Sequence, residues 1–164
     1  MTLTVRFARP DDLAAVDALL ARSYPRLLKA DYPPSVLVTA LPLISRAQPR
    51  LVTSGTFYVG LLDGEIVAAG GWTHHGPQSN KQTQRGHIRH VVTDHRHTGR
   101  GFGRALIRHT LEQAKSAGIR HMECQSTLMA VGFYRALGFD EIGPLEIELR
   151  PGIIFPAVQM IRKI

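Results

Sequence analysis

Hydrophobic and polar positions follow two different periodicities along this chain, and the shorter period predicts β-strands. Apolar and polar residues alternate with period two, or gather in short β-branched runs, in seven segments. Strands are therefore expected at residues 3–8, 56–62, 65–72, 87–93, 119–125, 139–149 and 153–164. Asp63-Gly64 predicts a tight hairpin turn between the second and third strands, and Pro151-Gly152 marks the turn between the last two.

The longer period places apolar residues three and four positions apart and predicts helices. One helix is expected to open at Arg9-Pro10-Asp11-Asp12, where a proline and two acids suit a first turn. Two more are expected at about 101–117 and 127–137, each followed by a glycine that suits a helix C-terminus. Between residues 24 and 50 the chain is expected to form only short helical pieces, broken by prolines 25, 33, 34, 42 and 49.

The order of these elements predicts the fold class. Hairpins alternate with strand–helix–strand units, which favours a mixed sheet flanked by helices. A polar loop at about 73–85 leads into the strand at 87–93. No boundary or repeat divides the sequence, so a single domain is expected over residues 1–164.

Composition narrows the class of protein without naming a function. The 164 residues are 44% hydrophobic and 20% charged, as in globular proteins. The single cysteine, Cys124, excludes an internal disulfide framework and fits a reducing compartment. No apolar run reaches the roughly 20 residues that cross a bilayer, and the N-terminus lacks the apolar core of a signal peptide. A cytoplasmic protein without a membrane partner is expected.

The basic charge and the histidines do not by themselves indicate a ligand. The net charge is +7, which favours polyanions, yet the Lys and Arg residues are dispersed and aromatic residues make up only 7%. No nucleic-acid partner is therefore predicted. Eight histidines raise the question of a metal, but His95 and His97 lie in a predicted loop with no cysteine pair nearby. No metal site is predicted.

The segment 96–103 carries the clearest functional signal. Its sequence, Arg96-His97-Thr98-Gly99-Arg100-Gly101-Phe102-Gly103, lies between a predicted strand and a predicted helix. At such a junction, backbone N–H groups and the positive end of the helix dipole favour a phosphate or pyrophosphate, and glycines allow close approach. A Walker loop would need Gly-Lys-Ser/Thr where this chain has Gly103-Arg104-Ala105, and the glycine spacing does not match a dinucleotide fingerprint.

A third phosphate-binding pattern fits better. Arg96-x-x-Gly99-x-Gly101 resembles the coenzyme A motif of the GNAT superfamily of N-acetyltransferases, and the segment 130–139 resembles the Ala-x-x-φ-Tyr…Gly-Phe signature of that family. The resemblance implies a mixed, mostly antiparallel sheet of about seven strands flanked by helices. It also implies acetyl-CoA as cosubstrate, acetyl transfer to a primary amine by direct attack, and a possible homodimer.

The resemblance assigns cofactor contacts to the strand, the loop, the helix start and the second signature. These residues are Val91, Val92, Thr93, Arg96, Thr98, Gly99, Arg100, Gly101, Phe102, Gly103, Arg104, Thr127 and Ala130. Three positions depart from the family pattern: Thr98 replaces a common Arg, His95 a common Pro, and Thr127 a common Asn. The first two departures should leave an amide-based site intact, and Thr127 can still cap its helix.

The same resemblance offers candidates for proton transfer. Tyr134 occupies the position of a family tyrosine that protonates the departing thiolate, although it also belongs to an ordinary apolar helix stripe. His87 stands where relatives often carry a Glu base, and Glu123 on the next strand is a further candidate. His90 would point to the opposite face if the strand is regular. Cys124 is interpreted as a buried strand cysteine.

The acceptor stays open at this level. The amine is expected to enter between the segment 24–50, the loop 73–86 and the C-terminal strands, where the sequence is least informative. A small metabolite, a polyamine, a peptide N-terminus and a lysine are all compatible, although the basic charge disfavours polycations. The alternative function is a sensor that binds acyl-CoA without turnover.

Overall fold

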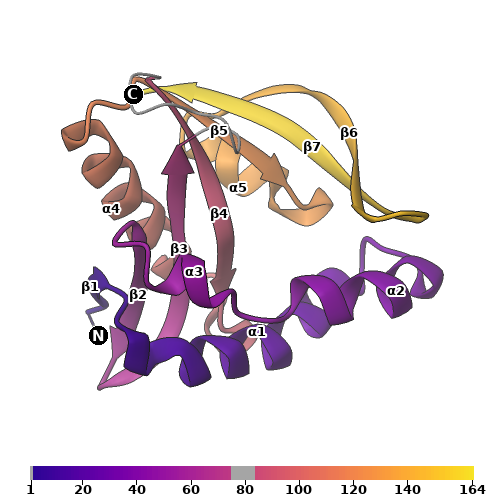
Figure 1. The fold of residues 1–164 in the computed structure, drawn as a ribbon, viewed down its shortest axis with the longest axis horizontal. Helices are drawn as coiled ribbons and strands as arrows, with labels where there is room; N and C mark the ends of the chain where they lie inside the picture. The colour runs from indigo at the N-terminus through magenta and orange to yellow at the C-terminus, as the bar shows by residue number, and fades with distance from the viewer. Residues whose placement is uncertain (1, 75–83) are drawn as a thin grey trace.

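The computed structural model describes residues 2–74 and 84–164 and contains one seven-stranded sheet of order β1-β2-β3-β4-β5-β7-β6 (Figure 1). Every neighbouring pair is antiparallel except β4–β5, which is parallel. The predicted mixed, mostly antiparallel sheet is therefore confirmed. The strands are β1 Thr4–Phe7, β2 Phe57–Leu62, β3 Glu65–His74, β4 Arg85–Thr93, β5 His121–Ser126, β6 Asp140–Arg150 and β7 Ile153–Lys163.

Helices cover both faces of the sheet, and each face has its own apolar cluster. One cluster joins the sheet to α1 and its neighbours α2 and α3, and the other joins it to α4 and α5. The helices are α1 Leu13–Leu28, α2 Pro34–Ile44, α3 Pro49–Val52, α4 Phe102–Ser116 and α5 Val131–Ala136, with 3-10 turns η1 Pro10–Asp12, η2 His95–His97 and η3 Leu128–Ala130. None of the helices in these described residues is long and apolar enough to span a membrane.

The predicted turns are confirmed by their backbone angles. Asp63 and Gly64 both have positive φ, 49° and 80°, as a two-residue hairpin turn of the right twist requires. Gly118 and Gly138 have φ of 93° and 88° and follow α4 and α5, where a left-handed residue ends a helix.

The prediction of proline breaks in residues 24–50 is wrong at two positions. Pro25 lies inside α1, and Pro42 lies inside α2. Each proline removes a backbone hydrogen bond, but Tyr24 and Leu28 on either side of Pro25 are buried in the core. Packing of the apolar stripe therefore carries α1 through the proline.

The expected polar loop at 73–85 is shorter than predicted at both ends. Strand β3 extends to His74 and β4 begins at Arg85, in register with β3 through Thr73–His87 and His74–Gly86. Most of this predicted loop, residues 75–83, lies outside the described residues. The cause of the longer strands is this pairing between two chain segments, which single-sequence alternation does not reveal.

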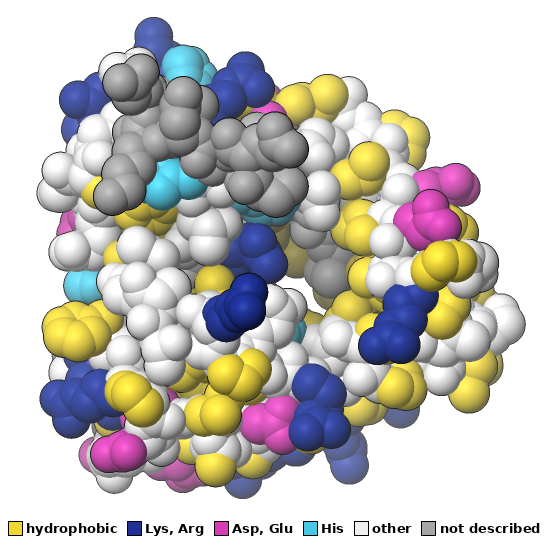
Figure 2. All heavy atoms as spheres, viewed as in Figure 1, with side chains coloured by type: hydrophobic (Ala, Val, Ile, Leu, Met, Phe, Trp, Pro, Cys, Tyr) yellow, Lys and Arg dark blue, Asp and Glu magenta, His cyan; other side chains and the backbone are white. Residues whose placement is uncertain are grey.

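The parallel pair β4–β5 opens into a wedge. The two strands pair only at Arg85–His121, Gly86–Met122 and His87–Glu123, and then separate, while β5 continues in pairing with β7. The β6–β7 hairpin extends away from the rest of the sheet on the same side as α2 (Figure 1). In the same view the surface is hollowed between the hairpin side and β4 (Figure 2).

One tyrosine ties the walls of this region together. Tyr32 stacks on Phe155 of β7 with ring centroids 4.5 Å apart, and its hydroxyl donates to the carbonyl of Pro156 at 2.6 Å. The same hydroxyl accepts from the backbone N–H of Leu128 at 3.1 Å. The α1–α2 connection, the hairpin and η3 are thereby held in one arrangement.

Candidate active site

A cavity of about 570 Å³ fills the wedge between β4 and β5. Its wall runs from the loop after β4 and the start of α4, past the separating strands, to α1 and α5. Among the residues around it are Tyr24, Ile88, His90, Val91, Val92, Thr93, His97, Thr98, Gly99, Gly101, Phe102, Gly103, Arg104, Cys124, Gln125, Thr127, Met129, Ala130, Phe133 and Tyr134. The cavity therefore joins both predicted signatures, 96–103 and 130–139.

The loop end of the cavity is suited to a phosphate. Gly99 and Gly101 have left-handed φ of 78° and 81°, with open space where a side chain would begin. Helix α4 starts directly after them, and no side chain of the described residues caps its first turn. The first backbone N–H groups of α4, at Phe102 to Arg104, are thus available to an anion, and the helix dipole adds to their attraction.

A buried carboxylate holds this loop in place. Asp94 has no exposed surface, and its oxygens accept from the backbone N–H of Arg96 at 2.9 Å and from the Arg96 guanidinium at 2.8 Å. The Arg22 guanidinium of α1 donates to the same carboxylate at 2.9 Å. The hydrogen bonds from Arg96, followed by those from Arg22, hold the pKa of Asp94 well below its usual range. The carboxylate is therefore charged at neutral pH and fixes the strand–loop junction.

The predicted cofactor residues fall into two groups. Eleven of the thirteen line the cavity, whereas Arg96 and Arg100 do not. Arg96 is turned to Asp94 and Glu65, and Arg100 donates to Nδ1 of His97 at 2.8 Å and lies over the Phe102 ring. The geometry gives both arginines a role in shaping the loop.

Strand β4 is irregular beside the cavity. His90 and Val91 lie opposite the single residue Gly70, because the register passes from Ala69–Val92 directly to Gly71–Arg89. His90 has φ of +53°, which is uncommon for a residue with a side chain, and such bulges re-aim side chains near functional sites.

The bulge changes the predicted direction of His90. Its ring lies on the α1–α2 side, where Nε2 is 2.7 Å from the carbonyl oxygen of Ile44 and the Tyr24 ring is 5.9 Å away. Ile88 packs in the cluster on the α4–α5 side, so His87 also faces the α1–α2 side. The prediction that His87 and His90 point to opposite faces assumed a regular strand. The bulge places both side chains on the same face.

Tyr134 is buried and lines the cavity beside Cys124. Burial, and then the neighbouring Cys124 side chain, raises the pKa of Tyr134 well above its usual value. Burial also raises the pKa of Cys124 to about 12. At neutral pH both groups therefore keep their protons, and the interpretation of Cys124 as a buried strand cysteine is confirmed.

The two other candidates for proton transfer lie at the apex of the wedge. His87 and Glu123 are register partners at the last paired position of β4 and β5, and neither is among the residues around the cavity. Glu123 is mostly buried and forms an ion pair with Arg85, Oε1 to Nη1 at 3.5 Å.

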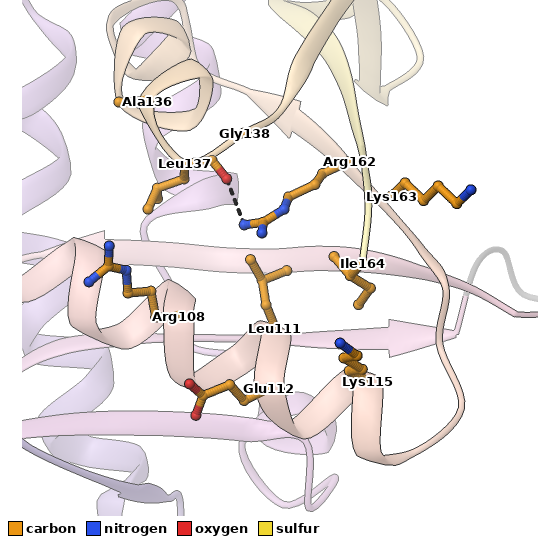
Figure 3. A pocket seen from close by; sticks show the side chains of 10 residues that line it. All are labelled: Arg108, Leu111, Glu112, Lys115, Ala136, Leu137, Gly138, Arg162, Lys163 and Ile164. Atoms are coloured by element: carbon orange, nitrogen blue, oxygen red, sulfur yellow. Dashed lines mark hydrogen bonds between the residues drawn. The ribbon is translucent and has the colours of Figure 1, made fainter.

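A second cavity of about 630 Å³ lies between α4, the end of α5 and the end of β7 (Figure 3). Arg162 points to the carbonyl oxygen of Leu137 at 2.7 Å, while Arg108 and Lys163 point outward at opposite ends. Only the end of the second signature, Ala136 to Gly138, reaches this groove, and neither the loop 96–103 nor a proton-transfer candidate is among the residues around it. The smaller cavity in the wedge is therefore the candidate site.

Sequence reasoning missed several residues of the site. Asp94 lies two positions before Arg96, a spacing at which an Asp side chain often accepts from the backbone, so a local signal existed. The Tyr24 hydroxyl donates to the carbonyl of Val91 at 3.0 Å. Because Tyr24 and Val91 are 67 residues apart, no local sequence signal indicated this contact. The bulge at His90 depends on pairing with Gly70 and likewise has no local signal.

Comparison with known protein families matches most of the chain. The sequence profile of the acetyltransferase (GNAT) family matches residues 18–139. No curated protein sequence matches the chain significantly.

Solved structures share the fold at low sequence identity. A GCN5-related N-acetyltransferase from Rhodopseudomonas palustris superposes with a TM-score of 0.81 at 19% identity, covering 100% of this chain and 97% of that one. The PaiA N-acetyltransferase from Thermoplasma acidophilum, solved with coenzyme A, gives 0.76 at 12% identity and covers 100% of both chains. The N-acetylglutamate synthase from Neisseria gonorrhoeae, solved with coenzyme A and N-acetyl-glutamate, gives 0.66 at 14% identity, covering 99% of this chain and 35% of that one.

Proposed function

The chain belongs to the acetyltransferase (GNAT) family, and from this premise we propose that it transfers the acetyl group of acetyl-CoA to a primary amine by direct attack. The observation that carries the proposal is the continuity of the cavity. One space leads from the uncapped start of α4, which suits a pyrophosphate, to the buried hydroxyl of Tyr134.

The cosubstrate would be held mainly by backbone. The loop glycines Gly99 and Gly101 and the first turn of α4 would hold the pyrophosphate, and Arg104 and Thr98 lie on the same wall. The strand residues Val91 to Thr93 and, across the wedge, Thr127 and Ala130 would flank the pantetheine arm.

Tyr134 is the proposed general acid. In the reaction, the amine nitrogen attacks the thioester carbonyl carbon, a C–N bond forms, the C–S bond breaks, and the departing thiolate needs a proton. A tyrosine with a raised pKa keeps its proton at neutral pH and can donate it to that sulfur. Direct attack is favoured over an acetyl-cysteine intermediate, because the neutral thiol of Cys124 is a poor nucleophile.

His87 is the proposed general base, which takes the proton that the amine nitrogen loses. It faces the α1–α2 side of the sheet, where the wedge begins. His90 is a second candidate, because it lines the cavity itself. A carbonyl oxygen only accepts, so Nε2 of His90 carries the proton toward Ile44, and Nδ1 keeps its lone pair.

The pH dependence of kcat/KM separates the two histidines. Burial lowers the pKa of His90, so a base at this position would place the midpoint of the acid limb of kcat/KM below the usual His pKa of about 6.5. His87→Ala should remove the acid limb and most of kcat if His87 is the base. His90→Asn, which tolerates positive φ, should remove the acid limb and most of kcat if His90 is the base.

The function itself is tested by incubating the protein with acetyl-CoA and a panel of amines while thiol release and product mass are measured. The expected result is an acetylated primary amine and free CoA in equal amounts. Calorimetric binding of acetyl-CoA without transfer to any amine would overturn the enzymatic proposal and favour a sensor.

A further inference from the structure

The α1–α2 face of β4 presents a row of polar side chains next to the candidate site. Ile88 packs into the opposite cluster, so its neighbours His87 and Arg89 point to this face. The ion pair between Arg85 and Glu123 places their side chains on the same face. With the His90 ring turned the same way by the bulge, β4 directs its basic side chains toward the region that the amine must enter.

Among the described residues, one basic side chain on this face of β4 has no partner. Glu123 is the acid that β5 contributes, and Arg85 already pairs with it. Arg89 is half-buried, yet its side chain makes no hydrogen bond or ion pair with any residue in the ranges 2–74 and 84–164. Arg89 directly precedes His90, whose side chain lines the cavity. Burial is the main cause that lowers the pKa of that imidazole, and the positive charge of Arg89 helps to lower it. In Figure 2, Lys or Arg side chains border the hollow of this face.

A half-buried guanidinium without a partner loses hydration without compensation. Its planar fork of donors matches the two oxygens of a carboxylate or a phosphate, and such charge-assisted pairs are strong where water is partly excluded. An acceptor with an oxyanion group would supply the missing partner, whereas a second cationic group on the acceptor would be repelled.

We propose that the acceptor of this enzyme carries an oxyanion, a carboxylate or phosphate, on the same molecule as its primary amine, and that Arg89 binds that oxyanion. This inference rests on the proposed function, because it names the substrate class of the same site. Arg89 acts here as a specificity-determining residue and does not take part in proton transfer.

The test compares amines that share a chain and differ in charge. Values of kcat/KM are measured for 5-aminopentanoate, pentylamine and cadaverine, and a second pair, phosphoethanolamine and ethanolamine, distinguishes phosphate from carboxylate recognition. The oxyanion member should exceed its neutral partner by about 10-fold or more, as expected for a charged hydrogen-bonded pair, and cadaverine should be the poorest of its set.

Variants assign the preference to one side chain. Arg89→Gln should abolish the preference by raising KM for the oxyanion acceptor, with the KM for acetyl-CoA unchanged, and Arg89→Lys should keep part of it. Arg108→Gln, on α4 in the second cavity, removes the same charge elsewhere and should leave the preference intact. Calorimetric binding of acetyl-CoA to each variant verifies that it is folded.

The outcomes separate this inference from the proposed function. Acetylation of neutral and cationic amines as fast as of their oxyanion partners would overturn the inference and leave the proposed function standing. A preference that survives in Arg89→Gln would equally overturn the role of Arg89. Acetylation of no amine at all would overturn the proposed function, and the inference with it.

Discussion

The two ends of the candidate active site, a proposed donor end and a proposed acceptor end, are built from different parts of the chain. At the donor end, one continuous segment, 94–104, supplies a carboxylate anchor, left-handed glycines and a helix start. At the acceptor end, side chains from β4 and β5 meet α2 across a bulge. A site made of adjacent backbone groups leaves a local pattern in the sequence. A site made of side chains from distant segments leaves none.

The largest expected effect lies where the two ends meet, at Tyr134. Tyr134→Phe removes the proposed proton donor and should lower kcat by about 10²- to 10⁴-fold. The ring packs near Phe133 and Phe139, so the phenyl ring should keep these contacts, and the Kd for acetyl-CoA should hardly change. Steady-state kinetics with parallel calorimetry checks both. An unchanged kcat would remove Tyr134 from the mechanism.

The next effect concerns the anchor of the donor end. Asp94→Asn leaves the Arg22 and Arg96 guanidiniums without their common carboxylate, and should cost about 3 kcal/mol in the free energy of unfolding, since both arginines remain partly hydrated. Urea unfolding measures this loss. A cost near that of an ordinary surface ion pair would mean that the loop does not depend on Asp94.

The native protein and Asp94→Asn should also differ in how their stability depends on pH. The pKa of Asp94 is lowered in the folded state, so its stabilisation is complete above the usual Asp pKa of about 4 and is lost as the pH falls further. The stability difference between the native protein and Asp94→Asn should therefore be constant from neutral pH to about pH 5 and narrow at lower pH. A gap that instead narrows above neutral pH would assign the stabilisation to another group.

A smaller effect tests whether backbone geometry binds the cosubstrate. Gly101 has φ of +81°, and an Ala there costs about 1–2 kcal/mol of strain, or about 5- to 30-fold in Kd for acetyl-CoA if the loop shifts to relieve it. Gly143→Ala is the matched control, because Gly143 has ordinary φ and open space around it on β6. Equal Kd values for both variants would contradict a backbone-based donor site.

The smallest effect restores a residue that the family commonly has. Thr98 lines the cavity at the loop, and Thr98→Arg adds a cation beside the proposed pyrophosphate site. The expected gain is about 0.3–1 kcal/mol, a few-fold in Kd, and it should shrink as salt is added. A tighter Kd that ignores salt would have a cause other than charge.

The sequence predicted the features that depend on neighbouring residues and missed those that depend on distant ones. The hairpin at Asp63-Gly64, the helix after Gly101 and most of the cavity-lining residues were predictable, because each depends on neighbours in the chain. The path of α1 through Pro25 and the bulge at His90 were not predictable, because burial against distant residues and pairing with β3 decide them. Tyr24 enters the candidate site through the same long-range packing.

The most direct test of the central claim, that the wedge beside the loop 94–104 is a coenzyme A site, is a calorimetric titration of the protein with acetyl-CoA. We expect saturable binding to one site per chain, weakened in Gly101→Ala and unchanged in Gly143→Ala. Absence of binding at high micromolar acetyl-CoA would contradict the account.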